Sequence, residues 1–221
     1  MSDSTSKTRV VVVDDQNISR GFFEMYVRAA SDYVLVAGLR TAQEAIDFVE
    51  GRSIDLLIMD VMMQDGIDGL TAATKIKQEH PDIKVILTTS TSETSWEEKA
   101  KQAGIESFWY KEYDEHGLLE IMERTMKGES VYPLDQPKVP FGKITRADLT
   151  ERELEILREL TASMTNEEIA EKLQISVNTV KRHIQNIMEK TGFESRLDLA
   201  TNAKLLGLVV SDKDRMKDGT E

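Results

Sequence analysis

The sequence predicts an α/β domain built on a doubly wound, five-stranded parallel sheet, followed by an all-α domain of four short helices. In the first 127 residues, five short β-branched runs alternate with helix-length segments, which is the order of a parallel sheet with crossover helices. Three of the four prolines lie between positions 133 and 140, and proline disfavours helix at the residue before it. Beyond them, only helical periodicity precedes Leu208. We therefore predict an extended linker at 131–143 between the two domains.

The elements of the first domain follow from apolar runs and from helix-capping signals. The strands are expected at 10–13, 34–39, 55–59, 85–88 and 107–110. The helices are expected at 18–30, 42–50, 70–80, 96–103 and 118–127. Thr41 and Glu44 form a capping-box signature at one helix start, and Gly104 can close another helix.

The second domain has equally clear punctuation. A hydroxyl three residues before a carboxylate marks three helix starts, a serine can cap the fourth helix, and two glycines can end helices. These signals are Thr150 with Glu153, Thr165 with Glu168, Ser195 with Asp198, Ser176, Gly192 and Gly207. The predicted boundaries are 9–127 for the first domain, 128–146 for the linker, 147–210 for the second domain and 211–221 for a charged tail.

The composition excludes several classes of protein. Cysteine is absent from the 221 residues, which excludes disulfides, thiolate catalysis and cysteine-based metal sites. No apolar run approaches the roughly 18 residues of a membrane span, and the polar N-terminus does not resemble a secretory signal. We therefore expect a soluble, cytoplasmic protein. The net charge of −12 comes mainly from residues 1–127, with 14 basic against 23 acidic side chains, so a local basic patch remains possible downstream.

Charged side chains follow the predicted strands of the first domain. Asp14 and Asp15 end the first strand, Asp60 ends the third, and Lys111 follows the fifth. Right-handed crossovers can bring the first and third strand ends together, and carboxylates in one crevice repel each other unless a cation is present. Mg²⁺ is the natural candidate because it prefers oxygen ligands and keeps waters that a phosphate can replace. A lysine beside the cluster can hold a phosphoryl oxygen, and a hydroxyl from Thr88-Thr89 can donate to another.

This constellation resembles the receiver domain of two-component response regulators, through the stretches VVVVDDQ, LLIMDVMM, VILTTS and FWYKE. The resemblance implies that Asp60 is the phosphoacceptor, phosphorylated by a sensor histidine kinase, and that Lys111 neutralises the transferred charge. It also implies that Asp15 binds Mg²⁺ directly, Asp14 through water, and Met62 through its backbone carbonyl.

The family spacing also selects two switch residues. Counting 22 residues back from Lys111 selects Thr89 as the switch hydroxyl, and the same register makes Phe108 the aromatic side chain that moves with it. The chain departs from the family after the phosphoacceptor, where VMMQDGIDG has Gln64 in place of the usual proline and is one residue longer. This departure puts the rate and lifetime of phosphorylation in doubt.

The segment Val177–Thr191 predicts an amphipathic helix with a polar reading face. A three-residue turn separates it from a preceding helix at 166–173, which is the helix-turn-helix spacing. Its polar side chains can form bidentate contacts with base edges in the major groove. LTERELEIL, TNEEIAEKLQISVNTVKRHIQNIMEKTG and SRLDLA resemble the LuxR-type DNA-binding domain, which places this helix in the groove. By position, the expected base or phosphate contacts are Lys181, Arg182 and Gln185, followed by Thr179, Asn178 and Asn186.

The two resemblances together form the NarL/FixJ architecture, which implies phosphorylation-controlled transcription. The expected partners are a sensor histidine kinase, double-stranded promoter DNA and a second copy of the chain on DNA, since two linked contacts bind better than one. A haloacid-dehalogenase-type phosphatase would need a second aspartate at the position of Met62, so an enzyme is not expected. A sensor of a small ligand would need an apolar cavity in the first domain, whereas this domain is predicted to have a charged crevice, so such a sensor is not expected. A phosphorylation-independent regulator remains the alternative.

Overall fold

The computed structural model describes residues 7–63, 66–91, 95–111, 117–133 and 139–209. The chain divides into two compact units; among the described residues, the first lies within 7–133 and the second chiefly within 139–209. Each unit is described by itself. Gln64 and the predicted tail 211–221 lie outside the described residues. Among the described helices, none is long and apolar enough to cross a membrane.

The first unit is a five-stranded parallel sheet in the order β2-β1-β3-β4-β5, which confirms the predicted α/β fold. The strands are β1 (Thr8–Val13), β2 (Tyr33–Leu39), β3 (Leu56–Asp60), β4 (Lys84–Thr89) and β5 (Ser107–Tyr110). The helices are α1 (Asn17–Ala29), α2 (Ala42–Val49), α3 (Gly69–Glu79), α4 (Ser95–Gln102) and α5 (Leu118–Met126). The predicted bounds differ from these by at most two residues, and those of β5 agree.

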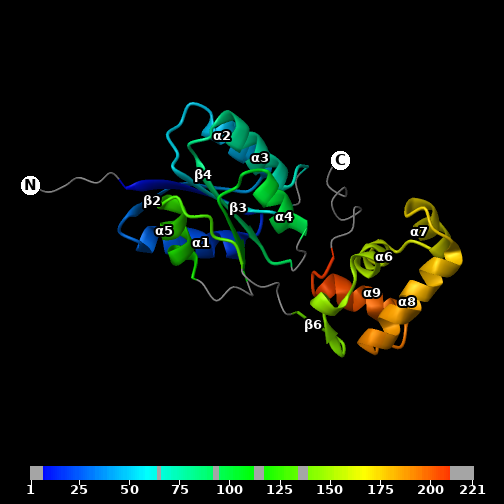
Figure 1. Cartoon of the computed structure of the whole chain (residues 1–221). Coiled ribbons are helices and arrows are strands. Elements are labelled where there is room, and N and C mark those ends of the chain that lie inside the picture. The colour runs from blue at the N-terminus through cyan, green and yellow to red at the C-terminus, as the bar shows by residue number, and fades with distance from the viewer. Residues whose placement is uncertain (1–6, 64–65, 92–94, 112–116, 134–138, 210–221) are drawn as a thin grey trace, which may run out of the picture. The chain divides into compact units, whose positions relative to one another are not determined.

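Alternating side chains of the strands form two separate cores. On one face, Val11 and Val13 pack with α2, α3 and α4, and on the other Val10 and Val12 pack with α1 and α5. Figure 1 shows the two groups of helices on opposite faces of the sheet. Strands buried on both faces are typical of parallel sheets. This layering leaves the carboxyl ends of the central strands free to carry polar side chains.

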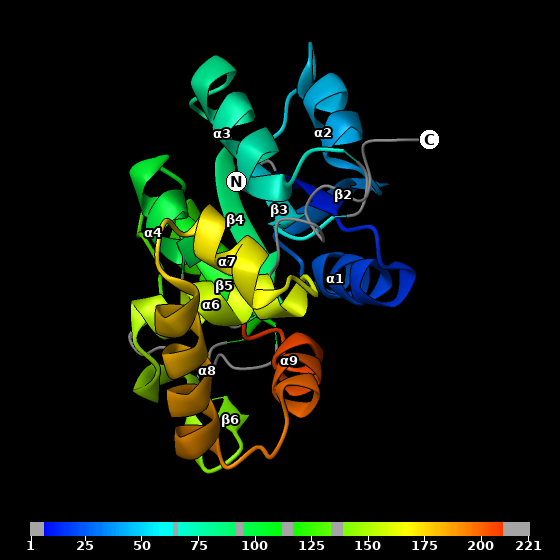
Figure 2. The ribbon, with the colours of Figure 1, turned by 90° about the vertical axis from the view of Figure 1, so that its right-hand side faces the viewer.

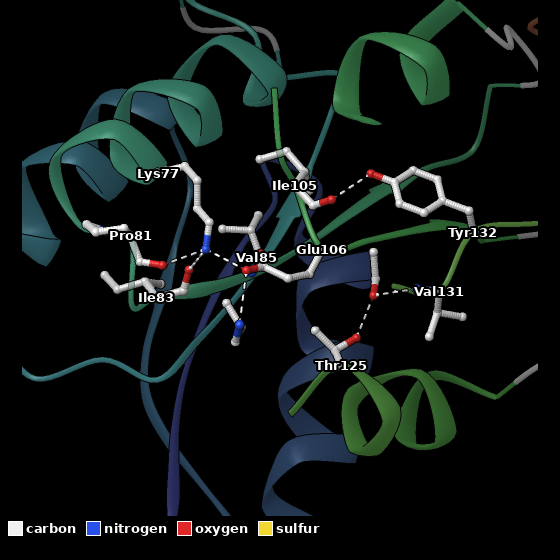
Figure 3. Close-up of polar contacts among 11 residues, drawn as sticks. Lys77, Pro81, Ile83, Val85, Ile105, Glu106, Thr125, Val131 and Tyr132 are labelled. Carbon is white, nitrogen blue, oxygen red and sulfur yellow. Dashed lines mark hydrogen bonds and ion pairs between the residues drawn. The ribbon is translucent and has the colours of Figure 1, made fainter. Parts of the chain in front are cut away.

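A partly buried ion pair joins the N-terminal ends of β4 and β5 to α3 (Figure 3). Lys77 Nζ lies 2.5 Å from Glu106 Oε1 and also donates to the carbonyls of Pro81 and Ile83, at 2.8 and 2.9 Å. Glu106 in turn accepts the backbone N–H of Val85 at 3.0 Å. These contacts join α3, β4 and β5. Lys77 and Glu106 therefore stabilise the packing of these elements, at the end of the sheet opposite the carboxyl ends of the strands.

Both ends of the segment predicted as an extended linker pack into the folded units. Val131 is buried and its carbonyl accepts the N–H of Phe108, while Tyr132 donates from its hydroxyl to the carbonyl of Ile105 at 2.8 Å (Figure 3). The segment after α5 therefore covers the exposed edge of β5. At the other end, the strands β6 (Pro140–Phe141) and β7 (Ile144–Thr145) form a hairpin, although no strand was expected before Leu208.

The second unit is helical apart from this hairpin, as the views in Figures 1 and 2 show. Its helices are α6 (Glu151–Thr161), α7 (Asn166–Lys172), α8 (Val177–Thr191) and α9 (Arg196–Leu205), preceded by a short 3₁₀ turn at Arg146–Asp148. The capping boxes at Thr150 and Thr165 form as predicted. Gly192 ends α8 in the left-handed conformation, with φ +77°, which favours glycine.

The hairpin belongs to the core of the second unit because its side chains are apolar. Val139 and Phe141 are buried among the helices, and Phe141 contacts the ring of Phe193 at 5.1 Å. Gly142 at the turn has φ +63°, and a Cβ there would lie 2.1 Å from the carbonyl oxygen of Thr191. The prolines favoured a linker in the prediction, although this segment forms a short strand pair. The pair depends on packing against distant residues, which the local sequence pattern does not indicate.

Candidate phosphorylation site and nucleic-acid interface

Three carboxylates meet at the carboxyl ends of β1 and β3. In the sheet Val13 is paired with Met59, so the next residues, Asp14 and Asp60, follow neighbouring strands at the same edge. One carboxylate oxygen each of Asp14, Asp15 and Asp60 lies within 4.8 Å of the others. Asp14 and Asp60 are buried and Asp15 is half-buried. The structure thus brings together the three acids that the sequence predicted.

Lys111, which directly follows β5, reaches across this cluster. Its ammonium lies 2.8 Å from Asp14 Oδ2 and 3.1 Å from Asp60 Oδ1. The second contact is close enough for an ion pair, but Asp60 Oδ1 has no hydrogen-bond partner of suitable geometry among the described residues. The Lys111 ammonium thus pairs with Asp14 and Asp60 at once.

The buried position of Asp60 changes its acidity. Burial raises the pKa of Asp60 to about 7, because charge is poorly solvated there; Lys111 lowers this pKa, whereas the charges of Asp14 and Asp15 add to the rise. Near neutral pH the carboxyl group is therefore close to half-ionised in the absence of a further cation. A second positive charge in the pocket would favour the ionised form.

The donor set fits Mg²⁺. Carboxylate oxygens are the ligands that this ion prefers, and Asp60 Oδ1 is a buried oxygen without a hydrogen bond from the described residues. Asp14 differs, because its Oδ1 accepts the N–H of Gln16 at 2.8 Å and its Oδ2 accepts from Ser19 and Lys111. Two already occupied oxygens agree with the expectation that Asp14 acts through water.

The other predicted residues of this site are Thr89 at the end of β4, Met62 shortly after β3, and Phe108 within β5. Thr89 and Phe108 are both fully buried, and Phe108 packs against the rings of Tyr110 and Tyr132, at 5.2 and 6.4 Å. Met62 is partly buried against the core and follows Asp60 by two residues. Their roles as switch residues and as a carbonyl ligand stay predictions.

Ser19 and Arg20 also contact the site, and the sequence reasoning missed both. Ser19 Oγ donates to Asp14 Oδ2 at 2.5 Å and accepts from Lys111 at 3.1 Å. Arg20 donates to the backbone carbonyl of Asp14 at 2.7 Å. Neither follows a strand. They reach the pocket because α1 begins directly after the acidic pair, and only helix geometry could have indicated that.

The second unit carries the predicted polar face of α8. Val180, Ile184 and Ile187 are buried in the core of this unit. The opposite face exposes most of the predicted contact residues, namely Asn178, Lys181, Arg182, Gln185 and Asn186. A helix with one buried stripe and one exposed cationic and amide face is suited to lie in the major groove.

Two of the predicted contact residues have partners within the helix. Thr179 is half-buried, and its hydroxyl lies 2.8 Å from that of Ser176, the residue that caps α8. Gln185 donates to Glu189 at 2.9 Å. Lys181 and Arg182 therefore stand out as the exposed cations of this face, on the first two turns of α8.

The turn before α8 uses strained backbone. Gln174 has φ +52° and Ser163, before α7, has φ +61°, both in the left-handed region that favours glycine. Both positions carry side chains, so these two turns adopt the left-handed conformation without glycine.

Two protein families match the chain. Residues 10–123 match the response regulator receiver domain, and residues 147–203 match the bacterial regulatory proteins of the luxR family. The chain is a response regulator. Its receiver domain and LuxR-type domain together confirm the predicted NarL/FixJ architecture.

Its relatives include the response regulator protein VraR of Staphylococcus aureus, which is 34% identical over 193 residues, 85% of this chain and 92% of that protein. Among solved structures it is similar to RcsB of Salmonella enterica serovar Typhimurium bound to a promoter with the phosphomimetic BeF₃⁻. That likeness has a TM-score of 0.60 and 22% identity, and covers 92% of this chain and 100% of that one. A LuxR-family response regulator from Aurantimonas sp. matches with a TM-score of 0.54, 24% identity and coverage of 61% and 93%.

Proposed function

We propose that this response regulator is a transcription regulator that a sensor histidine kinase switches by phosphorylating Asp60. The observation that carries the proposal is the position of Asp60, buried at the end of β3, 3.1 Å from the Lys111 ammonium and beside two further carboxylates. A role as a signalling switch, rather than as an enzyme with substrate turnover, agrees with its membership of the response regulators. Because its partner DNA lies in the cytoplasm of bacteria, we place the protein there.

In the proposed reaction, a carboxylate oxygen of Asp60 forms a bond to phosphorus as the bond between phosphorus and the phosphohistidine nitrogen breaks. The leaving nitrogen keeps the electron pair. Lys111 lies close enough to Asp60 to bind an oxygen of the transferred group, and Thr89 is proposed to donate to another. Asp15, Asp60 and the carbonyl of Met62 would hold Mg²⁺ directly and Asp14 would hold it through water; the bound ion would neutralise charge at the transferred group. Phe108 is proposed to change its packing when Thr89 moves.

Labelling with acetyl phosphate tests the phosphoacceptor. With Mg²⁺ present, Asp60→Asn is expected to abolish incorporation of the phosphoryl group, because the amide is a much poorer nucleophile. Asp55→Asn is the matched control, since Asp55 lies at the opposite end of β3, where it pairs with Arg9 at 2.6 Å. Labelling that persists in Asp60→Asn would remove Asp60 from the site. An unlabelled wild type that still binds its promoter would favour the phosphorylation-independent regulator.

We propose that α8 reads promoter DNA in the major groove and that two copies of the chain bind adjacent half-sites. RcsB, which resembles this chain in fold, has been solved as dimers bound to DNA. Two linked contacts increase affinity because the second one is intramolecular. Asn178, Gln185 and Asn186 are proposed as secondary contacts. Thr179, whose hydroxyl contacts the capping Ser176, is proposed as a contact to the adjoining phosphate.

Promoter binding tests this face. Lys181→Ala and Arg182→Ala are expected to weaken binding about tenfold or more without affecting labelling of the first unit. Lys143→Ala removes the same charge at the C-terminal end of α8, where Lys143 lies beside Thr191 and Gly192 and not on the first two turns, and should leave binding nearly unchanged. The salt dependence separates the two kinds of contact, because loss of a phosphate contact flattens the slope by about 1, whereas loss of a base contact does not. Equal affinities in all variants would exclude this face.

A further inference from the structure

The Lys111 ammonium sits in a closed triangle of polar atoms. It donates to Asp14 Oδ2 at 2.8 Å and to Ser19 Oγ at 3.1 Å. Ser19 closes the triangle, because its hydroxyl donates to the same oxygen of Asp14 at 2.5 Å. The ammonium also lies 3.1 Å from Asp60 Oδ1. Its three protons thus have one neighbouring oxygen each, from three different residues.

Helix α1 provides a second contact to the Lys111 ammonium, from the ring of Phe23. Phe23 lies one turn beyond Ser19, so both side chains share a face of the helix. The ammonium stands 5.3 Å from the centre of the Phe23 ring, within the range of a cation–π contact. Phe23 is only 2% exposed and packs edge-on against Trp109 at 5.9 Å. The lysine ammonium is therefore held by two groups of α1, the packed ring of Phe23 and the hydroxyl of Ser19.

We propose that Ser19 is a positioning residue for phosphoryl transfer to Asp60, acting through Lys111; the inference rests on the proposed function. A lysine side chain has much rotational freedom, and a hydrogen bond from the α1 side restricts it before the reaction begins. Without that acceptor, the hydrogen-bond acceptors left for the ammonium among the described residues are the carboxylates of Asp14 and Asp60, and we expect it to move onto Asp14, away from the oxygens of the incoming group. The hydrogen bonds of the Ser19 hydroxyl go to Asp14 and Lys111, so we expect its effect on the rate of transfer and not on donor binding.

A matched pair of variants isolates the hydroxyl. Ser19→Thr keeps the hydroxyl. Ser19→Val has nearly the shape of the threonine variant but lacks the hydroxyl. In the full-length protein with acetyl phosphate and Mg²⁺, Ser19→Thr is expected to be phosphorylated at nearly the wild-type rate. Ser19→Val is expected to be about tenfold slower at saturating donor, the effect of losing one hydrogen bond to a charged group. The half-saturating donor concentration should not change. If valine prevents folding, Ser19→Ala replaces it.

A metal-free measurement provides a second readout. In EDTA, nitrogen-detected NMR should show the Lys111 ammonium signal in the wild type and in Ser19→Thr, because bonded protons exchange slowly with water. In Ser19→Val the signal is expected to be lost. Equal phosphorylation rates in the threonine and valine variants, whether fast or slow, overturn the role of the hydroxyl. A wild type that is not labelled overturns the proposed function instead, so the two failures are distinguishable.

Discussion

Replacing Asp60 with asparagine is expected to remove a pH-dependent destabilisation of the first unit. Asp60 is 2% exposed, and burial raises its pKa to about 7, far above the usual 3.8. Between these two values the folded protein holds one more proton than the unfolded chain. The free energy of unfolding contributed by this group is therefore greatest at low pH and is lost as the pH rises towards 7. Asparagine does not titrate, so Asp60→Asn lacks this dependence.

The magnitude follows from the displaced pKa. Each pH unit in the window changes the free energy of unfolding by up to about 1.4 kcal/mol. Without metal, we subtract the free energy of unfolding of Asp60→Asn from that of the wild type. This difference should be about 3 kcal/mol lower at pH 8 than at pH 5. Any constant effect of the amide, such as its altered contact with Lys111, cancels when the difference is compared across pH.

Urea unfolding followed by tryptophan fluorescence measures this difference. Both tryptophans of the chain, Trp96 and Trp109, belong to the first unit, so unfolding of the helical unit does not contribute. Samples in EDTA at pH 5, 6, 7 and 8 give the difference curve. Adding Mg²⁺ at pH 8 should then raise the urea midpoint of the wild type more than that of Asp60→Asn. A difference that stays flat between pH 5 and pH 8 would refute the assignment of a raised pKa to Asp60.

Two further substitutions test the packing around the site. Gly69→Ala is expected to lower the free energy of unfolding of the first unit by about 2 kcal/mol, because its Cβ would lie 1.9 Å from the carbonyl oxygen of Asp60; an unchanged urea midpoint would contradict that contact. Tyr132→Phe should cost about 1 kcal/mol through loss of the bond from its hydroxyl to the carbonyl of Ile105. If the urea midpoint of Tyr132→Phe equals that of the wild type, the segment after α5 is not fastened to the sheet by this bond.

Local sequence signals predicted the helices well where contacts between neighbouring residues determine the structure. The capping hydroxyls of Thr150 and Thr165 marked helix starts to within a residue, because a cap satisfies backbone N–H groups of its own first turn. The strand pattern failed around 131–143, where proline suggested a linker. There, long-range contacts decided the outcome: Val131 adds to the edge of β5, and Phe141 is buried among the helices.

The sequence by itself determined which acids and which lysine end the strands, because a buried strand must stop where charged residues begin. It also determined the two faces of α8 through the period of its apolar residues. Only the tertiary structure decided how Lys111 is held, since Ser19 and Phe23 come from another element more than eighty residues away, and no local pattern records that distance. It likewise decided the acidity of Asp60, because desolvation depends on every side chain that excludes water from the carboxylate.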